Sequence, residues 1–130
     1  LSDASKGGRI INVSSIAAKL GLEGVTVYSA AKAAQIVGSH RNLQLGKSRG
    51  ITVNTVAPGP VPTDASKPFL EKPDGSPSEM QVGMMAMTRA AARLGTTADI
   101  ADAVLLLVSE KSRWITAQWI SVSGGITGTM

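Results

Sequence analysis

The sequence contains no cysteine, one histidine and few aromatic residues. Without cysteine the chain can form no disulfide bond, no thiolate zinc site and no cysteine nucleophile. His40 alone cannot supply a multi-histidine metal site, so we expect no metal ion. The net charge of +4 is spread along the chain without aromatic residues at stacking intervals, which argues against a nucleic-acid partner.

Long apolar segments are also missing. No apolar run approaches the ~20 residues that a membrane-spanning helix requires, so we expect no membrane partner. No charged-then-apolar segment at the N-terminus indicates a signal peptide. We expect a cytoplasmic location. The chain does have 43% apolar and 17% charged residues over a length of 130. That composition is typical of one folded domain and not of a disordered chain or a coiled coil.

Strand and helix patterns alternate along the chain. Short runs rich in β-branched residues predict strands at 9–14, 51–57 and 119–122. An alanine-rich stretch predicts a helix over 28–47, and a capping-box pattern at Thr96 predicts another over 96–109. Strands separated by helical crossovers indicate an α/β fold with a doubly wound, parallel, Rossmann-type sheet.

The segment between the second and third strands is different in composition. Residues 60–78 contain five of the six prolines and have no clean period, and 78–89 predicts a short helix. We therefore expect residues 60–90 to form a lid or substrate loop. Met80, Met84, Met85 and Met87 lie within it. Because methionine adapts to irregular spaces, these residues either line an apolar substrate pocket or fill an irregular core.

Three polar residues near the first strand suggest proton-transfer chemistry. Tyr28 and Lys32 are four residues apart in a helix, so they lie on one face. A neighbouring ammonium favours an ionised phenol, and we predict that Lys32 lowers the pKa of Tyr28 enough for acid–base catalysis. Ser15 follows the first strand, at the edge where parallel sheets bind ligands. A Tyr-x-x-x-Lys pair alone also occurs by chance on helix surfaces, and a serine hydrolase would need a G-x-S-x-G elbow that is absent here.

Five segments in a fixed order make the pattern specific. They are 8–15 (GRIINVSS), 28–32 (YSAAK), 51–59 (ITVNTVAPG), 93–96 (RLGT) and 120–125 (ISVSGG). In order and spacing they resemble the C-terminal half of a short-chain dehydrogenase/reductase. The closest resemblance is to the ketoacyl-reductase-like branch, which includes fungal polyketide ketoreductases.

The resemblance implies an NAD(P)-dependent oxidoreductase that transfers a hydride between the nicotinamide and a carbonyl or alcohol substrate. Ser15 would polarise the carbonyl, Tyr28 would donate or accept the proton, and Lys32 would bind the nicotinamide ribose. The resemblance implies NAD(P) as the cofactor, and NADPH is the form that we expect, although the residue that would decide between the two lies in the half of the family's domain that this sequence lacks. The family also implies a small-molecule substrate and a homodimer or homotetramer for the full-length protein.

The resemblance assigns further cofactor-binding positions to the segment after the second strand. Pro58 and Gly59 would pass beside the nicotinamide, the backbone of Val61 would bind its carboxamide, and Thr63 would reach the carboxamide or a phosphate. A dehydratase or epimerase of the extended relatives shares the Tyr-x-x-x-Lys pair, but the Pro58-Gly59 landmark favours a reductase.

The sequence also departs from the family. No glycine-rich phosphate-binding loop occurs in it, so we expect residues 1–130 to be a partial Rossmann-type domain without its N-terminal dinucleotide-binding half. The strand at 9–14 would then be an edge strand. The alternative function is that of a truncated, catalytically inactive fragment that acts only in association with other chains.

Overall fold

A three-stranded parallel sheet forms the centre of the molecule. The structure, a computed structural model, describes residues 7–41 and 49–127. The strands are β1 (Arg9–Val13), β2 (Thr52–Pro58) and β3 (Trp119–Val122), in the spatial order β1-β2-β3. Both strand pairs are parallel, with Ile11 opposite Asn54 and Val56 opposite Ile120. The predicted α/β fold with a parallel, Rossmann-type sheet is therefore confirmed.

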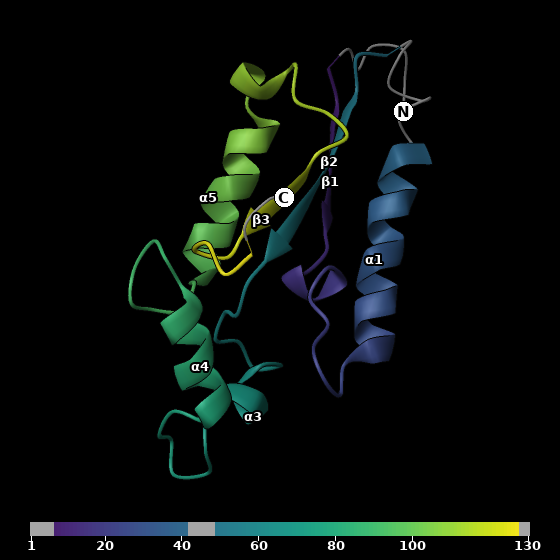
Figure 1. Ribbon diagram of the computed structural model, residues 1–130. Helices are drawn as coiled ribbons and strands as arrows, with labels where there is room; N and C mark the ends of the chain where they lie inside the picture. The colour runs from purple at the N-terminus through teal and green to yellow at the C-terminus, as the bar shows by residue number, and fades with distance from the viewer. Residues whose placement is uncertain (1–6, 42–48, 128–130) are drawn as a thin grey trace.

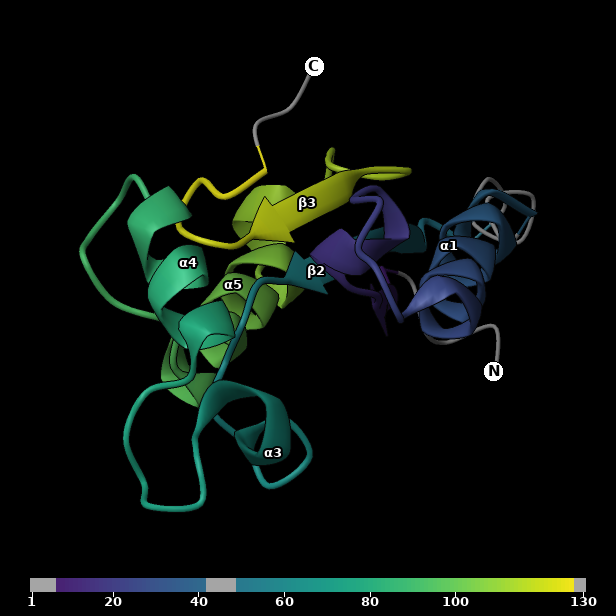
Figure 2. The same cartoon turned by 60° about the horizontal axis from the view of Figure 1, so that its bottom comes forward.

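The two long helices cover opposite faces of this sheet (Figure 1). Helix α1 (Thr26–Arg41) packs against β1 and β2, and helix α5 (Thr97–Val108) packs against all three strands. The turned view in Figure 2 shows the same separation of α1 from α5. Because β1, β2 and β3 follow one another in one direction across the sheet, two right-handed crossovers would place both helices on one face, so the two crossovers differ in hand. The predicted continuation of the first helix to residue 47 lies outside the described residues.

Strand β2 is the core of the fold. Val53, Val56 and Ala57 have no exposed surface, because β2 has a strand on each side and a helix above and below. Strand β1 has β2 on one side only among the described residues, as the prediction of an edge strand at 9–14 requires. In β2, buried residues follow one another without alternating with exposed ones, which is the pattern of a strand buried on both faces.

Helix α5 begins with the predicted capping box. The Thr96 hydroxyl accepts a hydrogen bond from the Asp99 amide, and the Asp99 carboxylate accepts one from the Thr96 amide. Leu107 is buried, whereas Val108 is 42% exposed. Val108 is the last residue of the helix, where the chain turns away from the sheet.

The proline-rich segment contains more regular structure than its sequence predicts. Helix α3 (Lys67–Leu70) and helix α4 (Glu79–Met87) pack together, and a bridge between Glu71 and Pro77 closes the turn between them. Two 3₁₀ turns, η1 (Ile16–Ala18) and η2 (Glu110–Ser112), were also missed. Elements of three or four residues are too short to show a hydrophobic period.

Candidate functional site

The candidate site lies at the edge of the sheet where the strands end. Because β1, β2 and β3 are parallel, their carboxyl ends at Val13, Pro58 and Val122 face the same side. Ligands of open parallel sheets bind at this edge. Gly59 follows directly after the end of β2, and Ser15 lies two residues after the end of β1, so the sheet brings them to one side of the molecule.

Ser15 is fixed by the turn that follows β1. It is the N-cap of η1, with an extended backbone, and its Oγ accepts a hydrogen bond of 3.1 Å from the Ala17 amide. Its side chain is half-buried. A hydroxyl that accepts from the backbone still has its own O–H to donate. Ser15 can therefore donate a hydrogen bond to an oxygen placed beyond the strand end.

Lys32 is bound to the end of the same strand. Its Nζ donates a hydrogen bond of 3.1 Å to the carbonyl oxygen of Val13. The Ser14 hydroxyl donates to the Lys32 carbonyl oxygen at 2.7 Å. These two bonds join α1 to β1 at the candidate site, and they hold the ammonium beside the turn that contains Ser15.

Tyr28 lies one turn before Lys32 on α1, as the spacing predicts. The Lys32 Nζ is 5.8 Å from the centroid of the Tyr28 ring, at the outer limit of a cation–π contact. Tyr28 is 49% exposed, so its hydroxyl can reach a ligand. The structure thus places the phenol, the ammonium and the end of β1 together.

Gly59 allows two strand ends to approach closely. Its amide donates to the Val122 carbonyl at 2.9 Å. A Cβ at this position would lie 2.8 Å from the Cα and the Cβ of Ser123, a distance that side chains do not tolerate. Glycine is therefore required here by the approach of β2 to β3.

Val61 and Thr63 lie in the segment that leaves β2. Ser66 orders this turn: its hydroxyl donates to the Val61 carbonyl at 2.7 Å and accepts from the Thr63 amide at 2.8 Å. The turn rests on the Arg93–Thr96 segment, because the Gly95 amide donates to the Pro60 carbonyl at 3.1 Å. Thr63 is exposed and Val61 half-buried.

Sequence reasoning missed three residues that position the site. The Asn54 side chain is fully buried, donates to the Ile115 carbonyl at 2.8 Å and accepts from the Gln118 amide at 3.1 Å. It therefore orders the loop that leads into β3. Its signal is a polar residue inside a buried strand, which must find partners. Ser14 and Ser66 act through side-chain hydroxyl bonds to the backbone, which sequence reasoning did not anticipate.

A charged pair fixes the segment before α5. Arg93 forms a two-bond salt bridge with Asp99, with distances of 2.7 and 3.0 Å. Hydrogen bonds from Arg93, followed by those from the Thr96 amide and hydroxyl, hold the pKa of Asp99 well below its usual range. The Asp99 hydrogen bond in turn raises the pKa of Arg93. This pair stabilises the start of α5 and belongs to no candidate catalytic group.

Two clefts lie beside the strand ends. One, of about 460 Å³, is lined by residues of α4 and of the 93–97 segment, including Met85 and Leu94. The other, of about 280 Å³, lies between Thr88 and the Ser123–Gly124 turn. Neither is lined by Tyr28 or Lys32.

Comparison with known proteins identifies the family. A family model described as enoyl-(acyl carrier protein) reductase matches residues 3–127. The chain belongs to the short-chain dehydrogenase/reductase family. It is 40% identical over 120 residues to the short-chain dehydrogenase/reductase FrzI from Cladobotryum sp., and 38% identical over 121 residues to the 3-oxoacyl-[acyl-carrier-protein] reductase FabG from Vibrio harveyi. These alignments cover 91% and 93% of this chain, respectively, and 46% of each relative.

The structural comparison agrees with the sequence comparison. The chain superimposes with a TM-score of 0.79 and 33% identity on a 7α-hydroxysteroid dehydrogenase complexed with NADH and 7-oxo glycochenodeoxycholic acid. The match covers 95% of this chain and 46% of that one. The predicted resemblance to a short-chain dehydrogenase/reductase is confirmed, and the chain spans less than half the length of the relatives that it matches.

The family implies a nicotinamide dinucleotide, and the residues at the strand ends fit one end of it. The Lys32 ammonium and the Tyr28 hydroxyl are donors of the kind that bind the vicinal hydroxyls of a ribose. Lys32 uses a carbonyl oxygen as its anchor, and its other N–H groups can face a ligand. No glycine-rich loop for the pyrophosphate occurs in the sequence. The residues present therefore fit the nicotinamide–ribose end of the cofactor.

Among the residues that the structure describes, no group of three or more His, Asp or Glu side chains could hold a metal ion. Within the same residues, no helix is long and apolar enough to cross a membrane.

Proposed function

We propose that the complete gene product transfers a hydride between NAD(P)H and a carbonyl or alcohol substrate. The observation that carries this proposal is the position of Lys32, whose Nζ is bound to the Val13 carbonyl and lies 5.8 Å from the Tyr28 ring. A cation beside an exposed phenol at a strand end is the arrangement that proton transfer to a bound ketone requires.

Each of the three polar residues has a separate task. The Tyr28 hydroxyl donates its proton to the carbonyl oxygen of the substrate. The Lys32 ammonium stabilises the phenolate that remains and binds the ribose hydroxyls. The Ser15 hydroxyl, oriented by its bond with the Ala17 amide, donates to the same carbonyl oxygen and polarises it. The nicotinamide, when bound, supplies or accepts the hydride.

The segment after β2 would hold the nicotinamide. Pro58 and Gly59 lie at the strand end and would contact one face of the ring. The Val61 backbone would bind its carboxamide, and Thr63, in the turn ordered by Ser66, would bind the carboxamide or a phosphate. The chain is similar to a protein named as a reductase, which favours the reductive direction, and we propose NADPH as the reductant.

Association of subunits is part of the same proposal. Trp114 is 95% exposed, and Leu105 and Leu106 on α5 are 63% and 72% exposed. Exposed apolar groups that cluster on one element are typical of subunit contacts. We propose a homodimer or homotetramer for the complete gene product.

A second candidate function follows from the length of the chain. It spans 46% of its relatives, and β1 has a neighbour on one side only among the described residues. A fragment of this kind would bind other chains through its sheet edge and have no turnover of its own. Carbonyl-dependent oxidation of NADPH by the complete gene product would exclude this alternative.

The test is the substitution Lys32→Met, which keeps the length of the side chain and removes its charge. We expect a loss of roughly 100-fold or more in kcat/KM for a reducible ketone, since acid–base catalysis typically contributes that much. Lys111→Met, in the exposed η2 turn far from the strand ends, is the matched control and should leave turnover unchanged. Equal activity of the two variants would contradict the proposal.

A further inference from the structure

The methionines of the lid do not form one group. Gln81 and Met85, four residues apart on α4, line the cleft shared with Pro62 and Leu94. Met80, Met84 and Met87 follow one another at intervals of four and three residues, so they lie along a different face of the helix. We call these three residues the methionine stripe.

The methionine stripe is not core filling. Met80 is 52% exposed and Met87 is 48% exposed, and Met84 is half-buried between them. Phe69 of the adjoining helix α3 is 63% exposed. Four large apolar side chains thus stay open to solvent on two helices that pack together. Large apolar side chains exposed on neighbouring helices are typical of a ligand or interaction site.

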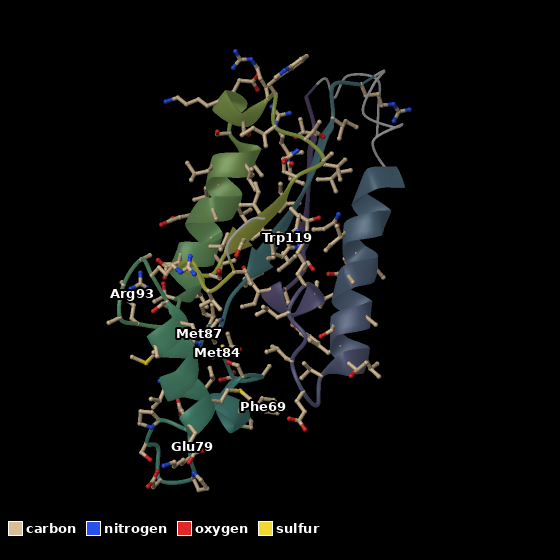
Figure 3. All side chains as sticks on the ribbon, in the orientation of Figure 1. Phe69, Glu79, Met84, Met87, Arg93 and Trp119 are labelled. Atoms are coloured by element: carbon tan, nitrogen blue, oxygen red, sulfur yellow. The ribbon has the colours of Figure 1, made fainter. Side chains whose placement is uncertain are left out.

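The stripe faces the candidate site. In Figure 3, Met84, Met87 and Phe69 lie on the side of α4 toward the strand ends and α1, whereas Arg93 lies on its other side. Figure 1 shows α3 and α4 across the strand ends from the first turns of α1, which carry Tyr28. The position of the helices places the stripe on the side from which a substrate would approach the phenol.

Hydrogen bonds anchor both ends of the lid to segments that flank the sheet, namely the segment before α5 and the turn after β3. At one end the Gly95 amide donates to the Pro60 carbonyl, and at the other the amides of Arg89 and Ala90 donate to the Gly124 carbonyl at 2.7 and 3.0 Å. Within the lid, the Ser78 hydroxyl donates to the Phe69 carbonyl at 2.7 Å. The apolar surface is therefore held by backbone bonds in a defined position relative to the strand ends.

The chemistry of this surface indicates its ligand. Methionine side chains adapt their shape and make favourable contacts with rings through their sulfur atoms. The stripe carries no charge, and at ~1.5 Å per residue it is on the order of 10 Å long. That length suits a few fused rings better than a short, polar keto acid or keto ester.

We propose that the methionine stripe, with Phe69, binds the body of an apolar, fused-ring ketone whose carbonyl is directed to Tyr28. This inference rests on the proposed function and adds the class of substrate. Met84, at the middle of the stripe, is its central specificity residue. A partner protein or a second copy of the chain is the competing occupant of the same surface.

The test compares two ketones on the complete gene product with NADPH. The bicyclic ketone 2-tetralone probes the stripe, and ethyl acetoacetate is the small, polar reference. The quantity compared is the ratio of kcat/KM for 2-tetralone to kcat/KM for ethyl acetoacetate. For the wild type we expect this ratio to be about tenfold or more. Met84→Gln should lower the ratio by about tenfold, the size of effect that small changes in an apolar pocket produce. Met84→Leu, which conserves volume and polarity, should keep the wild-type ratio and show that the lid is folded.

Val82→Gln is the matched control. Val82 is 58% exposed on the same helix but two residues away from Met80 and Met84, and so it lies on the other side. This variant should keep the wild-type ratio.

The possible outcomes separate the inference from the proposed function. If the protein reduces ethyl acetoacetate and Met84→Gln leaves the ratio of the two kcat/KM values unchanged, the inference is overturned and the proposed function stands. An unchanged ratio together with an altered sedimentation coefficient would assign the stripe to a contact between copies. Failure to reduce either ketone would contradict the proposed function itself.

Discussion

Gly59 stands where two neighbouring strands end and where the lid begins. The absence of a side chain lets its backbone lie against Ser123, and its amide binds the Val122 carbonyl. The same residue leads into Pro60 and Val61, which the lid and the proposed nicotinamide site share. Gly59 therefore allows β2 and β3 to pack closely and also leads the chain into the lid.

Substitution Gly59→Ala should destabilise the protein because its Cβ would lie 2.8 Å from backbone and side-chain atoms of Ser123. We expect a loss of about 1–3 kcal/mol in the free energy of unfolding, the typical cost of overpacking. Urea denaturation followed by circular dichroism measures this change.

Gly83 offers a control of opposite sign. It lies inside α4, and a Cβ there would meet no atom within 4 Å. Because alanine favours a helix over glycine, Gly83→Ala should raise the stability by about 0.5–1 kcal/mol. If both glycine variants were equally stable, the close approach at Gly59 would not matter energetically.

The start of α5 shows how one element is stabilised. Asp99 accepts hydrogen bonds from the Thr96 amide and hydroxyl and from the Arg93 guanidinium. Only its ionised form accepts all of these bonds, and its pKa in the folded protein is accordingly lowered. A carboxylate in the first turn also interacts favourably with the helix dipole.

The pH dependence of this element follows from the lowered pKa. Asp99 stabilises the fold above the pKa of the unfolded chain, near 3.8, and this contribution declines as the pH falls below that value toward the folded pKa. Asp99→Asn should therefore be less stable than the wild type at pH ~7, and the difference should shrink as the pH falls below ~4.

Urea denaturation at several pH values measures the difference. Asp102→Asn removes a charge one turn further along α5, outside the capping box, and should show a smaller and flatter difference. An Asp99→Asn difference that stays constant down to pH ~2 would contradict the proposed linkage.

Prediction from sequence succeeded where an element has a clear periodic or capping signal. The third strand was predicted with its observed bounds, and the Thr96 capping box marked the start of α5. The first helix begins two residues earlier than predicted, because Thr26 and Val27 carry no strong helix signal. In the lid, the prolines suggested a loop, but Pro68 is in the first turn of α3, where proline is tolerated.

The residues of the candidate site could be predicted from the sequence, but the hydrogen bonds between them could not. The spacing of Tyr28 and Lys32 on one helix predicts their proximity, and a strand followed by Ser15 predicts its place at the sheet edge. The bond from Lys32 to Val13, and that from Ser14 to Lys32, depend on how α1 docks on β1. Docking is a tertiary property that no local pattern of residues specifies.

At the scale of the whole molecule, the described fold is one side of a Rossmann-type sheet. The ends of the strands and the first turns of α1 carry the residues that we propose for proton transfer and for binding of the nicotinamide. The chain covers 46% of its relatives, and the sequence has no glycine-rich loop for the pyrophosphate. Cofactor binding and turnover are therefore to be measured on the complete gene product.

The most direct test of the central claim is the substitution Tyr28→Phe in the complete gene product, which removes the hydroxyl and keeps the ring beside Lys32. Carbonyl-dependent oxidation of NADPH should fall by roughly 100-fold or more, whereas the Kd for NADPH, measured by fluorescence titration, should stay close to that of the wild type. A Tyr28→Phe variant with near wild-type turnover would contradict the assignment of Tyr28 as the proton donor, and with it the account of this site.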